Sequence, residues 1–173
     1  MKKFLGVLFL ASGLLSFTAC SGEESDGPES DVIWDIAPFV IHITVSDKDG
    51  NDLLNPETSQ SIADNGIKAI WTGRTFEKDS IFVPDGQYRA VLAVFRGLYA
   101  NQWPDGRYRL SFGEFAGDRN YEPQELVIDW NDGTPNDTIV FSHSFWWENH
   151  EPNQKTIVYL NGKETDSPVH IVK

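Results

Sequence analysis

The sequence predicts an all-β fold, an antiparallel β-sandwich of about seven to nine strands. Three observations predict it. Apolar residues recur at every second position in several segments, tight-turn dipeptides separate those segments, and no segment of eleven or more residues has a convincing helical period. Many short strands that alternate with turns are typical of an antiparallel sandwich.

The first strand is predicted in the segment FVIHITVS, residues 39–46. Phe39, Ile41, Ile43 and Val45 are apolar, and the residues between them are mostly polar. Side chains on a strand alternate between its two faces, so one face of this strand is expected to be buried and the other to meet water.

Further strands are predicted at 67–72, 88–96, 107–115, 125–130, 137–145, 155–160 and 167–173. Residues 88–96, YRAVLAVFR, are apolar on both faces, which favours a central strand covered on both sides. The best helix candidate, residues 55–66, is expected to form no more than one or two short turns.

The connections support the same fold. Asp-Gly occurs at 49–50, 85–86, 105–106 and 132–133, and Asn-Gly at 65–66 and 161–162. Both dipeptides tolerate a positive φ and therefore favour tight turns between strands. LNGK at 160–163 is the clearest hairpin turn.

Charge and cysteine content limit the class of protein. The chain has 26 acidic and 14 basic residues and a formal net charge of −12. Nucleic acid is therefore excluded as a partner, because its phosphates require lysine and arginine. Cys20 is the one cysteine, so no disulfide stabilises the domain.

Residues 1–19 have the layout of a secretory signal, with Lys2 and Lys3 before an apolar stretch. The segment SFTAC, residues 16–20, resembles a bacterial lipobox, with Phe17 where leucine is usual. The resemblance implies cleavage before Cys20 and lipidation of that cysteine. The alternative is a lone thiol in a discarded signal.

Residues 20–31 are predicted to be a disordered acidic tether, and residues 32–173 the folded domain. Gly22, Glu23 and Glu24 resemble the acidic export signal of surface lipoproteins from Bacteroidetes-type bacteria. The alternative is that these residues are an ordinary polar spacer. The expected location is the outer membrane, with the lipid on Cys20 as anchor and with surface exposure as a further expectation.

The segments WDIAPFVIHITVSDKDGNDLLNP (34–56), FGEFAGD (112–118), VIDWNDG (127–133) and IVYLNGK (157–163) resemble a group of small uncharacterised lipoproteins of those bacteria. The resemblance implies an Ig-like or prealbumin-like sandwich and supplies no catalytic residue. Asp79-Ser80-Ile81 and Asp137-Thr138-Ile139 also look like short O-glycosylation sequons.

Candidate metal and catalytic groups are weak. Asp47, Asp49, Asn51 and Asp52 suit calcium by residue type, but Gly50 comes too early for an EF-hand, which favours a turn with solvated acids. The four histidines have no metal-binding spacing, and no serine elbow is present. We therefore predict no metal and no cofactor. Whether two of the carboxylates form a catalytic pair is left open, because their separation depends on the fold.

Aromatic residues are the best candidates for binding. Trp71 and Trp130 are expected in the core. Tyr99 and Trp103 lie in a predicted loop, residues 97–106, and Trp146 and Trp147 are neighbours that must face opposite sides of a strand. Exposed rings beside polar residues can stack on a sugar or hold a peptide.

The function predicted from these features is a non-catalytic binding module for a glycan or a protein, with Tyr99, Trp103, Trp146 and Trp147 as its ligand-binding residues. One alternative is an accessory subunit of a surface assembly. An unpaired, weakly charged strand edge would favour that role. A less favoured alternative is a hydrolase that uses carboxylates.

Overall fold

The computed structural model describes residues 27–28, 32–79 and 95–173. The described residues form ten β-strands and no helix. The strands are β1 (Phe39–Ser46), β2 (Lys68–Trp71), β3 (Arg74–Glu77), β4 (Leu98–Gln102), β5 (Tyr108–Phe115), β6 (Tyr121–Asp129), β7 (Asp137–Glu148), β8 (Glu151–Leu160), β9 (Lys163–Thr165) and β10 (Val169–Val172). None of the described residues forms a helix long and apolar enough to cross a membrane.

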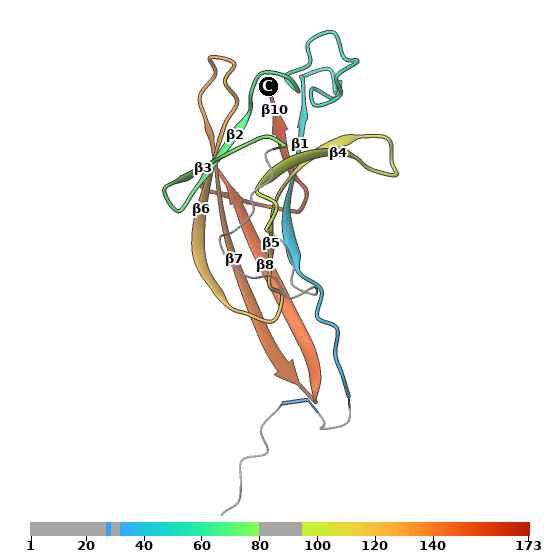
Figure 1. The fold of residues 1–173 in the computed structure, drawn as a ribbon, viewed down its shortest axis with the longest axis vertical. Coiled ribbons are helices and arrows are strands. Elements are labelled where there is room, and N and C mark those ends of the chain that lie inside the picture. The colour runs from blue at the N-terminus through green and yellow to red at the C-terminus, as the bar shows by residue number, and fades with distance from the viewer. Residues whose placement is uncertain (1–26, 29–31, 80–94) are drawn as a thin grey trace, which may run out of the picture.

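The strands form two sheets that pack as a sandwich, which confirms the predicted fold class (Figure 1). One sheet has the order β10-β1-β5-β4 and the other the order β3-β2-β6-β7-β8-β9. All neighbouring strands are antiparallel except β1 and β10, which are parallel. Ten strands are found rather than seven to nine because β3, β4 and β9 are short and lack a long alternating pattern.

The predicted alternation sets the faces of β1. Ile41, Ile43 and Val45 are almost fully buried, whereas His42 and Thr44 lie on the outer face. The core between the sheets is rich in rings, and Phe115 contacts Phe39 and Phe141 at centroid distances of 5.0 Å each. Rings supply large apolar surfaces, so they can support a core without disulfides.

Two hairpin turns explain how β7, β8 and β9 follow one another. Asn161 and Gly162 both have positive φ, which confirms the predicted LNGK turn between β8 and β9. Asn149 and His150 also have positive φ and connect β7 to β8. The β7–β8 hairpin is long, and its end lies at one extremity of the molecule, opposite the C-terminus (Figure 1).

Some predictions concern residues that the structure does not describe. The signal at 1–19, Cys20 and almost all of the tether lie outside the described residues, as do residues 88–94 of the predicted central strand. Residues 55–66 form turns, as predicted. The predicted loop at 97–106 was wrong in its first half, because residues 98–102 are strand β4, paired with β5.

Candidate functional site

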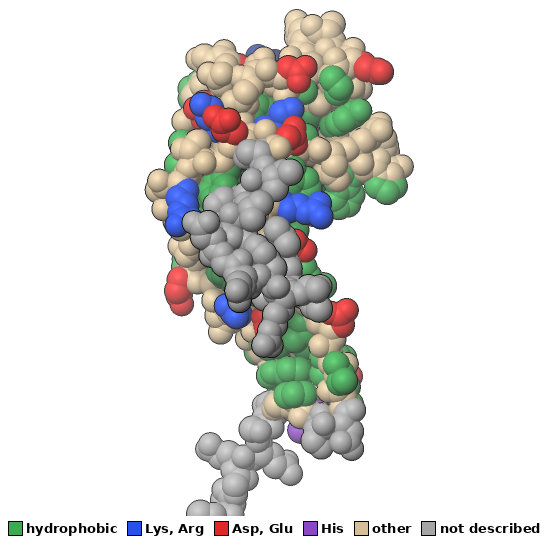
Figure 2. Space-filling view, viewed as in Figure 1, with side chains coloured by type: hydrophobic (Ala, Val, Ile, Leu, Met, Phe, Trp, Pro, Cys, Tyr) green, Lys and Arg blue, Asp and Glu red, His purple; other side chains and the backbone are tan. Residues whose placement is uncertain are grey.

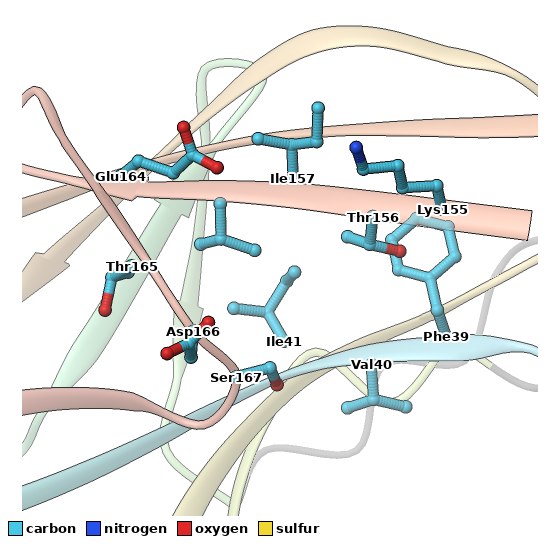
Figure 3. A pocket seen from close by; sticks show the side chains of 11 residues that line it. Phe39, Val40, Ile41, Lys155, Thr156, Ile157, Glu164, Thr165, Asp166 and Ser167 are labelled. Atoms are coloured by element: carbon cyan, nitrogen blue, oxygen red, sulfur yellow. The ribbon is translucent and has the colours of Figure 1, made fainter.

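An open groove of about 380 Å³ lies between β1 and β8, on one side of the sandwich (Figure 3). Its floor and walls come from residues 39–41 of β1, residues 155–158 of β8, and residues 164–167, which cross from one sheet to the other. In Figure 3, Ile41 and Thr156 point toward each other across the space between β1 and β8.

The groove exists because strand pairing stops early in both sheets. β10 pairs with β1 only from Ile43 onward, and β9 pairs with β8 only from Val158 onward. Residues 39–42 of β1 and 151–157 of β8 therefore have no strand partner on this side among the described residues. Two unpaired edges face the same groove.

The floor of the groove is apolar, with one buried polar group beneath it. The ring of Phe39 stacks on the ring of His143 at 4.2 Å, and His143 is 2% exposed. Nε2 of His143 lies 3.1 Å from the carbonyl oxygen of Gly117, which can only accept, so Nε2 carries the proton. In the neutral ring, Nδ1 then accepts from the hydroxyl of Thr156, 2.7 Å away.

Thr156 shows that the groove opens onto the inner side of the sheet. Val158, two residues along β8, shares its face and is buried, yet Thr156 is exposed. An inward-facing residue is exposed only where the opposing sheet is missing. The unpaired edge of β1 thus lies beside apolar surface that no strand of the described chain covers.

The two edges differ in chemistry. β8 has Pro152 and Lys155 on its unpaired stretch, and both residue types are common on edges that avoid pairing. Residues 39–42 of β1 contain no formal charge with His42 neutral. Burial lowers the pKa of His42, and the nearby charge of Arg109 lowers it further, so this edge stays uncharged near neutral pH.

Tyr99 and Trp103 lie away from the groove, on the outer face of the four-stranded sheet. Both are half-buried. The guanidinium carbon of Arg109 lies 3.9 Å from the centre of the Trp103 ring, and the ring of His42 meets it edge-on at 4.8 Å. Nε1 of Trp103 is buried without a partner among the described residues, so its polar edge does not point toward solvent.

His42 also contacts a serine on the same face. Its Nδ1 lies 2.9 Å from Oγ of Ser111, and Ser111 is 1% exposed. A serine that is buried in this way cannot reach a substrate, so the pair joins β1 to β5 rather than forming a nucleophile and base.

Trp146 and Trp147 lie near the end of the β7–β8 hairpin. As predicted, they face opposite sides of the strand. Trp147 contacts the ring of Trp34 at 6.4 Å, whereas Trp146 is 41% exposed. The four predicted binding residues therefore occupy two separate places and do not form one site.

The acidic turn at residues 47–52 is structural in the described chain. Oδ1 of Asp47 accepts from the backbone N–H of Asp49 and of Asn51. The side-chain hydrogen bond from Asn51, followed by backbone bonds, lowers the pKa of Asp47. No group of three or more potential metal ligands occurs among the residues that the structure describes.

Sequence reasoning missed the groove, its lining residues Phe39 and Thr156, and His143 beneath it. A signal for His143 was present, because Ile139, Phe141 and His143 alternate and therefore share the inner face of β7. No local signal marks the groove, since it depends on where β9 and β10 stop pairing.

Comparisons of the chain with protein-family models, with curated proteins and with solved structures give no match. A function for this chain has to be inferred from its own residues.

Proposed function

We propose that the protein is a lipid-anchored surface module that binds an extended segment of a partner protein in the groove beside β1. The observation that carries this proposal is the uncharged edge of residues 39–42, which has no strand partner on the β10 side among the described residues and lies beside the half-buried ring of Phe39. An incoming strand would continue the line of β10 and pair with β1 through backbone hydrogen bonds. This is the assembly role that an open strand edge favours.

The chemistry of the groove indicates which segment would fit. Phe39 and Ile157 line the groove and are only half-buried, so they offer apolar contacts, and alternate residues of the partner should be apolar. Glu164 and Asp166 line one wall, and both are exposed. A lysine or arginine in the partner segment could pair with them, whereas an acidic segment would be repelled.

The anchor in this proposal is lipid on Cys20, and the location is the outer membrane. The lipobox-like segment at 16–20 and the acidic residues 22–24 support both. Stable anchoring needs more than one acyl chain, which a modified lipoprotein cysteine supplies. We also propose that the chain belongs with the small Bacteroidetes-type lipoproteins that it resembles and that its sandwich is Ig-like or prealbumin-like.

A peptide display experiment tests the proposal on the full-length protein in detergent micelles. We expect selection of extended peptides with alternating apolar residues and at least one basic residue. Changing Val40 to proline should reduce binding by about tenfold or more, because proline lacks the N–H and blocks strand addition. Val40 lies at a bulge, between the paired residues Phe39 and Ile41, so β1 should still pair with β5.

Charge reversal provides a matched control. The double variant Glu164→Lys with Asp166→Lys should weaken the binding of basic peptides and strengthen the binding of acidic ones. Glu122→Lys with Glu125→Lys makes the same change of charge on exposed residues of β6 and should leave selection unchanged. If peptides are not selected, or if all these variants bind them equally well, the groove is not the binding site.

Glycan binding is a second candidate at a different place. Trp146 is 41% exposed, and Asn153 lies opposite it on β8, so a ring and an amide are adjacent. A glycan array tests this, with Trp146→Ala as the variant. Glycan binding that is lost in Trp146→Ala but kept in Val40→Pro would favour a glycan as the ligand over a peptide.

A further inference from the structure

The end of the molecule that carries the hairpin tip is unusually apolar. Five large apolar side chains are exposed among the described residues, and four of them lie here: Val32 at 44%, Ile33 at 98%, Trp34 at 39% and Trp146 at 41%. Figure 2 shows hydrophobic side chains gathered at this lower end of the molecule. Single exposed apolar residues are common, but exposed apolar residues that gather in one place indicate a protein or membrane interaction site.

Trp34 lies on the side of the hairpin that Trp147 faces, and Val32 and Ile33 come directly before it in the chain. The contact between Trp34 and Trp147 holds this segment beside β7. Trp146 points to the opposite side, because neighbouring strand residues face opposite ways. We call Val32, Ile33 and Trp34 the VIW face, and Trp146 serves as an exposed ring on the other side.

The chain itself brings this end close to the proposed anchor. Nδ1 of His150, at the hairpin turn, donates to the carbonyl oxygen of Gly27 at 2.8 Å. Gly27 is the seventh residue after Cys20, and a fully extended chain of seven such steps spans at most about 25 Å. Lipid on Cys20 would therefore hold the hairpin tip within about 25 Å of the bilayer.

We infer that the VIW face rests on the interfacial region of the bilayer and orients the domain on the membrane. This inference depends on the proposed lipid anchor. Tryptophan prefers the membrane interface, where its ring meets apolar chains and its N–H meets polar groups. With the VIW face on the bilayer, the hairpin leans on the surface, and the groove lies farther from the membrane than the tip.

Charges limit both the depth and the kind of membrane. Asp35, Glu148 and Glu151 are exposed near the VIW face, so this end cannot enter the hydrocarbon region without moving carboxylates out of water. They also make an anionic surface a poor partner. The occupant that fits is therefore the shallow interface of a zwitterionic bilayer.

The test uses the full-length lipoprotein reconstituted in phosphatidylcholine vesicles, with bromine atoms near the headgroup end of the acyl chains as quenchers. Tryptophan fluorescence should be quenched in the wild type. Trp34→Phe should lower the quenching by about twofold, because the interfacial ring is removed, and Ile33→Asp should lower it further. Trp146→Phe, the matched control on the opposite side, should leave quenching unchanged.

Sedimentation of the same vesicles separates failure of the inference from failure of the anchor. Protein that sediments but is not quenched would show that the domain stands away from the membrane, which overturns the inference and leaves the anchor intact. Quenching that depends on Trp146 instead of Trp34 would also overturn it. If the protein stays in the supernatant, both the proposed anchor and the inference are wrong.

A second copy of the chain is the competing occupant of the VIW face. In that case quenching would be absent, and the wild type would be a dimer in detergent that Ile33→Asp converts to a monomer. That result would overturn the inference. Ile33 is 98% exposed, so its replacement should not disturb folding.

Discussion

Residues 139–143 and residues 145–148 belong to the same strand, β7, but their side chains have different surroundings. In the first group every second residue is buried: Ile139, Phe141 and His143. In the second group the rings of Phe145 and Trp147 contact each other at 5.5 Å, and neither is fully buried. The same extended backbone thus serves the core in one half and an exposed surface in the other.

The difference follows from what lies opposite each half. Residues 139–143 face the four-stranded sheet, with Phe39 and Phe115 in contact with Phe141. Beyond Phe39, β1 has ended, so residues 145–148 face the segment that carries Trp34 rather than a strand. The groove lies at the junction, where Thr156 is the first inward-facing residue of β8 left exposed. We infer that the first half stabilises the fold and the junction and the second half make contacts with other molecules.

The largest expected effect is in the first half. Phe141→Ala should lower the free energy of unfolding by about 3–5 kcal/mol, because a fully buried ring is removed and a cavity remains. Urea denaturation of the full-length protein in micelles measures it. A loss below about 1 kcal/mol would show that residues 139–143 are not part of a close-packed core.

Gly117 tests the junction itself. A Cβ at this position would lie 2.1 Å from the carbonyl oxygen of Ala37, so backbone has to move. Gly117→Ala should cost about 1–3 kcal/mol and disturb the hydrogen bond that Gly117 accepts from His143. Thermal denaturation measures the cost. Gly133→Ala measures a different cost and serves as a comparison: Gly133 has a φ of 81° but no atom near its Cβ position, whereas Gly117 has no positive φ and a blocked Cβ position.

The end of the sandwich opposite the hairpin tip supplies a pH-dependent comparison. Burial alone would raise the pKa of Asp132, but hydrogen bonds from Lys173 and Thr134 and the charge of Lys173 lower it to about 2. A carboxyl group with a lowered pKa stabilises the fold above the pKa of the unfolded chain, 3.8, and this contribution is lost as the pH falls through about 2.

Lys173→Met should therefore lower stability by about 1–2 kcal/mol at pH 7 and by much less at pH 2. The free energy of unfolding of wild type and variant, measured by urea at both pH values, gives the difference. Loss of acid sensitivity in Asp132→Asn would support the assignment. An equal effect of Lys173→Met at both pH values would mean that the ion pair at 2.8 Å contributes nothing.

The smallest effect is expected in the second half of β7. Trp146→Ser should change the free energy of unfolding by no more than about 0.5 kcal/mol, because the ring is partly exposed and no other ring contacts it among the described residues. The same urea experiment measures it. A loss comparable to that of Phe141→Ala would remove the distinction between the two halves.

The sequence allowed the fold class and most strands to be predicted, because alternation is a local signal. β1 was predicted with its observed bounds. β4 was missed because Gly97 and Pro104 flank it and made residues 97–106 resemble a loop, although Leu98 and Ala100 alternate with Tyr99 and Asn101. Short strands depend on their partners more than on their own pattern.

The candidate site could not be predicted in the same way. Trp103 was predicted as a binding residue because it is an aromatic residue in a predicted loop. In the structure Arg109 and His42 cover its ring, and they lie beside it only because the strands pair into a sheet. The groove depends on the lengths of β9 and β10, which are set by the crossing at residues 164–167. No pattern within β1 shows that residues 39–42 have no strand partner on the β10 side in the described part of the chain.

Hydrogen–deuterium exchange with and without the strongest selected peptide tests the central claim most directly, since it reports backbone pairing at the edge itself. The account predicts slower exchange on peptide binding at residues 39–42 and 155–158, with no change at residues 98–103. Slower exchange confined to residues 98–103, with residues 39–42 unaffected, would contradict it.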